Sequence, residues 1–133
     1  MYKRQGLANK ELGETKQAES ALEKAAGIHE NGRYLEDTAY DWYLIASVRS
    51  KAGAYPEALE ALTTALSFDR RAENANGLGM DWMAIGIVAE KAGNAQQAAG
   101  AYRRSADIFN AAFLTKSAAE AEDKLEALEG KGK

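Results

Sequence analysis

Few residues of this chain could carry chemistry, and their setting favours structural roles. His29 is the only histidine among 133 residues, and the chain has no cysteine. A catalytic or metal-binding histidine needs convergent partners. His29 is therefore expected near the end of a helix, where the helix dipole favours a partial positive charge. The stretch "GLG" at 77–79 is too short for a phosphate-binding loop and follows no strand. We predict no enzymatic activity, no cofactor and no metal site.

Two aspartates, Asp41 and Asp81, each precede a tryptophan and stand forty residues apart. Paired carboxylates can act as general acid and base, but no nucleophile accompanies these two. An acid near the start of a helix is also favoured by the dipole. We expect a structural role for both aspartates, with Arg70 or Arg71 as a possible pairing partner.

The overall charge argues against several partners. The formal net charge is -3, with acids and bases interleaved, whereas a nucleic-acid-binding domain needs a basic face. No apolar run approaches the ~20 residues of a membrane-spanning helix, so no membrane insertion is expected.

The opening "MYKRQGLANKELG" has no signal region and is typical of the middle of an amphipathic helix. We interpret the chain as a fragment or a mature form, with the cytoplasm slightly favoured over the periplasm.

The tryptophans belong to a forty-residue repeat, "DWYLIASVRSKAGAYPEALEAL" from Asp41 and "DWMAIGIVAEKAGNAQQAAGAY" from Asp81. The abundance of Ala, Leu, Glu and Lys favours helix. Gly13, Gly53 and Gly93 stand where a helix C-terminus prefers glycine. Each glycine is predicted to join two antiparallel helices. The predicted first helices are 2–12, 34–52 and 77–92, and the second helices are 15–30, 55–72 and 95–111, with breaks between repeats at Asn31-Gly32 and Asn76-Gly77.

Small residues recur where the two helices of a hairpin should meet. They are Gly6, Ala46 and Gly86 on the first helices, and Ala18, Ala58 and Ala98 on the second. Such positions let helices approach closely, so Gly86 is expected at a close crossing near Ala98. Tyr2, Trp42 and Trp82 are expected to anchor the starts of the first helices.

The C-terminal segment 113–129 is predicted to be a capping helix. Its apolar face comprises Leu114, Ala118, Ala121, Leu125 and Leu128. The last residues, 130–133, are predicted to be a disordered tail.

These positions resemble the tetratricopeptide repeat (TPR) family. The residues that carry the resemblance are Trp42, Ala46, Gly53, Tyr55, Ala58, Leu62 and Ala65, then Trp82, Gly86, Gly93, Ala98 and Tyr102, and more weakly Tyr2, Gly6, Gly13, Ala18, Leu22 and Ala25. The usual TPR unit has 34 residues and a closing proline, whereas this repeat has forty residues and no such proline. It is similar to the longer-repeat branch found in kinesin light chains, and HEAT-type repeats are the structural alternative. The six extra residues should lengthen the helices or enlarge the loops.

The resemblance implies an all-α, right-handed superhelix of three antiparallel hairpins (about 1–32, 33–75 and 76–112) plus the capping helix. It also implies a concave face, built from the first helices, that binds a peptide or protein segment. By the family pattern that groove comprises Tyr40, Tyr43, Ser47, Ser50, Lys51, Met80, Met83, Ile87, Glu90 and Lys91, with Leu7, Lys10 and Glu11 in the first repeat. Tyr43 and Met83 are expected to be exposed, and Ile87 either exposed or buried.

The expected function is therefore non-catalytic protein–protein interaction. The alternative is a structural spacer or self-association unit within a larger multidomain or envelope-associated protein. Homo-association through an uncovered N-terminal hairpin is one form of this alternative.

Overall fold

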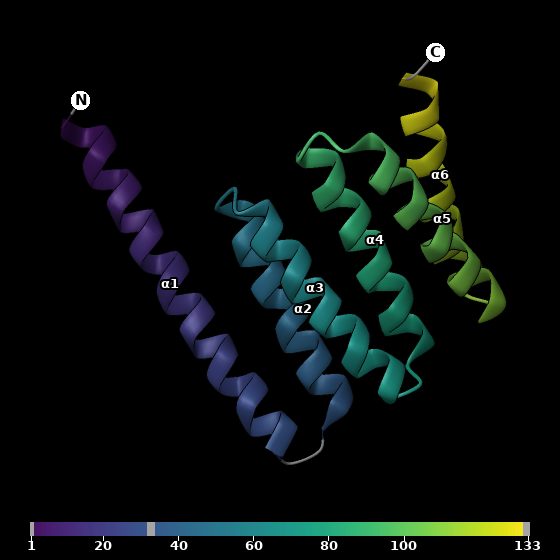
Figure 1. Cartoon of the computed structure of the whole chain (residues 1–133), viewed down its shortest axis with the longest axis horizontal. Helices are drawn as coiled ribbons and strands as arrows, with labels where there is room; N and C mark the ends of the chain where they lie inside the picture. The colour runs from purple at the N-terminus through teal and green to yellow at the C-terminus, as the bar shows by residue number, and fades with distance from the viewer. Residues whose placement is uncertain (1, 32–33, 132–133) are drawn as a thin grey trace.

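The chain folds as a row of sequentially packed helices. The computed structural model describes the backbone of residues 2–31 and 34–131, and the side chains of residues 13–28 and 34–130. Its helices are α1 (Tyr2–Asn31), α2 (Leu35–Lys51), α3 (Tyr55–Arg71), α4 (Ala75–Lys91), α5 (Ala95–Ala111) and α6 (Thr115–Lys131). Each helix packs against the next, and the two termini lie at opposite ends of the row (Figure 1). The predicted all-α, repeat-like architecture is confirmed.

The helices follow a regular register. Each of α2 to α6 has 17 residues. They begin at 35, 55, 75, 95 and 115, separated by turns of three residues. Two helices and two turns therefore make the forty-residue repeat, and its length lies in the helices because the turns are short. The last helix, α6, begins forty residues after α4 and so takes the place of the first helix of a further hairpin.

The turns share one backbone conformation. The middle residue of each has a positive φ: Gly53 (79°), Glu73 (54°), Gly93 (84°) and Phe113 (61°). In the first turn, the N–H of Ala54 donates to the carbonyl of Arg49 at 2.9 Å, which is the Schellman pattern for ending a helix. Glycine adopts this conformation without steric cost. An L-residue with a side chain loses about 1–2 kcal/mol in the same place.

The predicted hairpin at the N-terminus is wrong. The first helix, α1, continues through Gly13 and ends at Asn31, in register with the helices that follow. Within a helix a glycine costs about 1 kcal/mol relative to alanine but does not stop it, and the residues after Gly13 favour helix. The described chain therefore has two hairpins, α2–α3 and α4–α5, flanked by α1 and α6. The side-chain predictions for Tyr2, Gly6, Leu7, Lys10, Glu11 and His29 lie outside the described residues.

The predicted break at Asn76-Gly77 is also wrong, because both residues lie inside α4. The chain instead turns at 72–74, and Asn74 caps the helix by accepting a hydrogen bond from the N–H of Gly77 at 3.2 Å. The corresponding cap of α5 is Asn94, which accepts from the N–H of Gln97 at 3.1 Å. An asparagine cap satisfies a backbone donor that the first turn leaves free.

A small residue and a large one fill each hairpin crossing. In α2–α3 the pair is Ala46 and Leu62, and both are buried. In α4–α5 the equivalent pair is Gly86 and Tyr102, where a Cβ on Gly86 would lie within 3.0 Å of the Tyr102 ring. The predicted close crossing at Gly86 is confirmed, with Tyr102 as the residue that approaches it.

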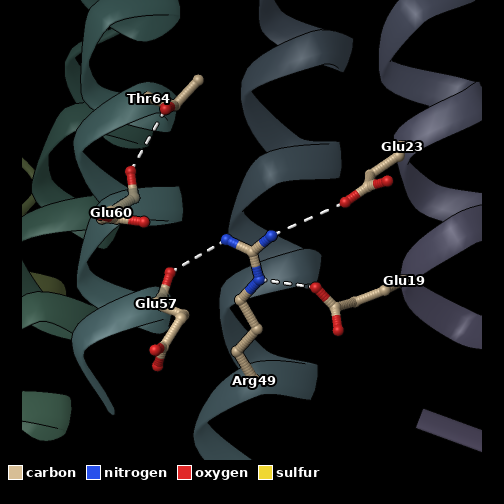
Figure 2. A network of polar contacts seen from close by, with 6 residues as sticks. All are labelled: Glu19, Glu23, Arg49, Glu57, Glu60 and Thr64. Atoms are coloured by element: carbon tan, nitrogen blue, oxygen red, sulfur yellow. Dashed lines mark hydrogen bonds and ion pairs between the residues drawn. The ribbon is translucent and has the colours of Figure 1, made fainter. Parts of the chain in front are cut away.

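Arg49 of α2 joins three helices (Figure 2). Its Nε donates to Glu19 of α1 at 2.6 Å, and one of its terminal nitrogens donates to the backbone carbonyl of Glu57 in α3 at 3.0 Å. A second carboxylate of α1, Glu23, lies 3.6 Å from the other terminal nitrogen. The Arg49 side chain is only 18% exposed, so these contacts are less screened by water than a surface ion pair. They fix the register of α1 on the first hairpin.

The apolar face predicted for the last helix is confirmed for its four residues inside α6, whereas Leu114 lies in the preceding turn because the helix begins at Thr115 and not at 113. Ala118 and Ala121 are buried, and Leu125 and Leu128 pack against the core of the second hairpin. The helix continues to Lys131, so the predicted disordered tail is wrong for its first two residues. Over the described residues, none of the helices is both long and apolar enough to cross a membrane.

Candidate functional site

The predicted groove residues line a series of hollows along α2 and α4. The first, here called the central hollow, has a volume of about 170 Å³. The structure brings six predicted residues to it: Tyr43, Ser47, Ser50, Lys51, Ile87 and Lys91. Its apolar floor comes from Ala46, Leu62 and Val88 of the hairpin cores. It combines an apolar base, two serine hydroxyls and two lysines.

The second, here called the acidic hollow, lies toward the N-terminal ends of the same two helices. Its volume is about 330 Å³. The predicted residues Tyr40, Tyr43 and Met80 line it, and Tyr43 also lines the central hollow, so the two hollows adjoin. Four acids also line it: Glu36, Asp37, Asp69 and Asp81.

The two remaining predicted residues turn toward the second hairpin and α6. Glu90 accepts a hydrogen bond from the hydroxyl of Tyr102 at 2.8 Å. Burial, together with this bond, raises the pKa of Tyr102. Met83 packs against the core formed by α4, α5 and α6.

The predicted exposure of Tyr43 and Met83 is wrong, because both are half-buried against hydrophobic clusters. Ile87 is half-buried as well. The exposed aromatic of the groove is Tyr40, at 54%. Its ring stacks on that of Tyr43, with the centroids 6.0 Å apart and the planes inclined by 10°.

Asp69 and Asp81 form a buried carboxyl pair at the base of the acidic hollow. Their exposed fractions are 4% and 2%. Asn74, the cap of α4, donates its side-chain N–H to Oδ1 of Asp69 at 3.0 Å. Gly77 leaves room for this arrangement, since a Cβ there would lie 2.5 Å from the Asp69 carboxyl group.

The two carboxyl groups cannot both be ionised easily in so dry a place. Burial, the hydrogen bond to Asp69 and the charge of Asp69 together raise the pKa of Asp81 to about 10, with burial as the largest cause. At neutral pH Asp81 is therefore protonated and donates to Asp69. Burial also raises the pKa of Tyr43, with smaller contributions from Asp81 and Tyr40.

The positions equivalent to this pair in the next repeat are apolar. Forty residues after Asp69 and Asp81 stand Phe109 and Ala121, which are 2% and 0% exposed. The ring of Phe109 packs where a Cβ on Gly79 would lie. The same layer is thus apolar in one repeat and acidic in the other.

The arginine pairing predicted for Asp81 is replaced by this contact with Asp69. Arg71 instead lies over the ring of Phe68, 5.3 Å from its centroid. Asp41 is buried too, at 7% exposure. Asp69 is absent from the residues predicted for the groove. The signal that points to it is its position forty residues before Phe109, where an acid replaces an apolar residue of the repeat.

A further hollow of about 430 Å³ lies on the opposite side, between α3, α4 and α5. Trp82 lines it, and the guanidinium of Arg104 lies over the tryptophan ring, 4.7 Å from the centroid. Arg70 lines it too. The charged residues of this hollow are thus arginines, whereas the hollows along α2 and α4 hold acids at one end and lysines at the other.

A scan against models of known protein families finds no match to this chain. A search of the curated proteins finds none that is similar to it. The fold is therefore defined by its own geometry, as a helical repeat of sequentially packed hairpins.

Proposed function

We propose that the chain is a TPR-like binding module that holds an extended segment of a partner protein along the α2–α4 face. The observation that carries the proposal is the continuity of the central and acidic hollows, which share Tyr43. Their linings mix aromatic, aliphatic, hydroxyl and charged groups. Such a mixture suits a protein-binding surface, where apolar anchors supply affinity and polar groups supply orientation. In this proposal the α2–α4 face is the concave side of a right-handed superhelix.

The face has a charge polarity that would orient the bound segment. Acids line one end, and Lys51 and Lys91 line the other. Asp81 and Lys91 are ten residues apart in α4, so the distance between them along the helix axis is about 15 Å at 1.5 Å per residue. An extended chain covers that distance in about five residues. A well-matched segment has a basic residue and an acidic residue about five positions apart, with apolar residues between them.

The proposal is tested by filling the central hollow. Short random peptides displayed on phage would be selected on the wild-type protein, and the affinities of the enriched peptides measured. Ser50→Trp places a large side chain in the hollow and should weaken binding at least about tenfold. Ser67→Trp makes the same change on the opposite face, where Ser67 is exposed, and should leave binding unchanged.

Equal binding by wild type and Ser50→Trp would contradict the proposal. So would a loss of binding in Ser67→Trp alone, because the binding surface would then lie between α3 and α5. Thermal melting of both variants would show that the hairpins remain folded.

The second candidate is a spacer or self-association unit. The observation in its favour is the exposure of apolar side chains at the two outer parts of the row, with Ile28 of α1 70% exposed and Phe113, in the turn before α6, 88% exposed. In this case the phage selection enriches no peptide, and sedimentation velocity shows association that Ile28→Asp or Phe113→Asp abolishes.

A further inference from the structure

We propose that the acidic hollow is a receptor for an arginine side chain, with its guanidinium group seated against the carboxyl pair of Asp69 and Asp81. The inference deepens the proposed function and rests on it, because the arginine would belong to the segment held along α2 and α4. It assigns the chemistry of one end of that segment.

The first argument is a buried oxygen that lacks a donor. Across the described residues, Oδ2 of Asp81 is the buried side-chain polar atom without a hydrogen-bond partner. It belongs to a residue that is 2% exposed and lines the acidic hollow. The group that bonds with Asp81 is Asp69, itself an acid. A proton must therefore lie between the two carboxyl groups, and a ligand that brings N–H donors can replace it.

The second argument is the charge of the surrounding surface. The acidic hollow is faced by Glu36, Asp37, Tyr40 and Tyr43 from α2, by Asp69 from α3 and by Asp81 from α4. Its lining, as far as the described residues show, contains no lysine, arginine or histidine. Burying acids without a positive partner is costly, so the site is complementary to a cation.

The third argument is that the equivalent positions of the next repeat carry no acid. They hold Phe109 and Ala121, both buried. Replacing buried charged groups by apolar ones of similar volume is often neutral or stabilising. The acidic pair therefore fits a binding role better than a packing role.

The shape and donors of guanidinium match the site better than those of ammonium. Guanidinium carries five N–H donors in a planar fork that can engage two carboxylates. It is less strongly hydrated than ammonium, so entering a dry site costs less. The stacked rings of Tyr40 and Tyr43 offer faces on which a planar cation can lie. The described residues contain no group of three or more acids or histidines close enough to hold a metal ion.

Arginine binding would displace the proton shared by the pair, and that proton passes to the solvent. Binding should therefore strengthen as the pH rises from about 6 to about 9, because fewer protons compete for the carboxyl groups. From α2 the pair is faced by Glu36, Asp37, Tyr40 and Tyr43. Burial raises the pKa of Tyr43, so its hydroxyl stays neutral over the same range.

The test uses the small probe N-acetyl-arginine amide and the whole chain. Amide resonances of Asn74 and Gly77, which adjoin the carboxyl pair, are followed by NMR during titration. The expected result is saturable shifts at both residues. The neutral isostere N-acetyl-citrulline amide and the amine N-acetyl-lysine amide should each bind at least about tenfold more weakly. Asp81→Asn should weaken arginine binding by a similar factor, and the exposed-site control Asp107→Asn should not change it.

Each opposite result overturns the proposal. Equal binding of the citrulline probe would remove the role of charge, and equal binding of the lysine probe would remove the assignment to guanidinium. Unchanged binding by Asp81→Asn would move the site elsewhere. Failure of the proposed function is distinguishable, because a protein that selects no peptides can still bind the small probe. A protein whose peptides are lost in Ser50→Trp but kept in Asp81→Asn would contradict this inference alone.

Discussion

The ring of Tyr102 occupies the space that a side chain at position 86 would need, and Gly86 is the residue that leaves it free. The equivalent crossing in the other hairpin pairs Ala46 with Leu62. A larger residue on one helix thus accompanies a smaller residue on the other. This exchange of volume lets two hairpins with the same backbone register close over different side chains.

The first prediction follows from this exchange. Gly86→Ala should lower the free energy of unfolding by about 1–3 kcal/mol through overpacking. Tyr102→Leu in the same chain should recover part of the loss, because the pair then matches Ala46 and Leu62. Urea denaturation of the single and double variants should give a favourable coupling of about 1 kcal/mol. Gly100→Ala is the control, since a Cβ there meets nothing within 4 Å, and it should stabilise by about 0.5–1 kcal/mol. Additive effects of the two substitutions would contradict the exchange.

The second prediction concerns the three-helix contact of Arg49. Arg49→Met keeps most of the aliphatic stem and removes the charge and donors. It should cost about 1.5–3 kcal/mol, the range for hydrogen bonds to charged groups. Arg103→Met breaks an exposed pair with Glu129 at 3.4 Å and should cost less than about 1 kcal/mol. Urea denaturation gives the loss in free energy of unfolding for each variant. Equal losses in Arg49→Met and Arg103→Met would show that Arg49 does not hold α1 in place.

The third prediction uses the shared conformation of the turns. Glu73 and Phe113 adopt positive φ values, so Glu73→Gly and Phe113→Gly should each raise the free energy of unfolding by about 0.5–1.5 kcal/mol. Gly53→Ala and Gly93→Ala should each lower it by a similar amount, for the same steric reason. Differential scanning calorimetry of the four variants gives the sign of the change in stability at each turn. A Gly→Ala change that stabilises the protein would contradict the requirement for a positive φ at the middle of the turn.

The fourth prediction concerns pH. The folded pKa of Asp81, about 10, lies above its ordinary value of 3.8. Its contribution to stability is therefore fully present below about pH 4 and is lost as the pH rises toward 10. Asp81→Asn keeps a donor to Asp69 and removes the titration. From about pH 5 to about pH 8 its stability relative to wild type should rise by up to about 4 kcal/mol, at ~1.4 kcal/mol for each pH unit.

Melting curves across that pH range give the measurement for Asp81. Asp107→Asn, a change at an exposed site, should follow the wild-type profile. A constant difference between Asp81→Asn and wild type at every pH would show that Asp81 does not change its protonation on folding.

The sequence predicts most of the fold because its repeat places glycine, alanine and tryptophan at fixed intervals. Those residue types determine where helices end and how closely they approach. The hairpin at Gly13 could not be excluded, since glycine is compatible with both a helix interior and a helix end. The turn at 72–74 was missed because its middle residue is Glu73, which does not indicate a positive φ.

The candidate site was predicted only in part. The spacing of Tyr43, Ser47 and Ser50 places them on one face of α2, which is a local property of the sequence. Ile87 stands forty residues after Ser47 and holds the equivalent place in α4. The contact between Asp69 and Asp81 depends on how α3 meets α4, and no local pattern contains that information. The half-burial of Met83 likewise depends on α6, which packs over the second hairpin.

Binding of an extended segment along the α2–α4 face is tested most directly by measuring the direction in which a bound peptide lies on that face. The probe is a peptide with arginine and glutamate about five residues apart, carrying a spin label at either end. Paramagnetic relaxation in the protein is then read from amide resonances. The expected result is broadening of Asn74 and Gly77 by the label at the arginine end, and of Gly53 and Gly93 by the label at the glutamate end. Broadening of amide resonances at the hollow between α3, α4 and α5 by either label would contradict binding along the α2–α4 face. The same pattern of broadening from both labels would contradict a single direction of binding.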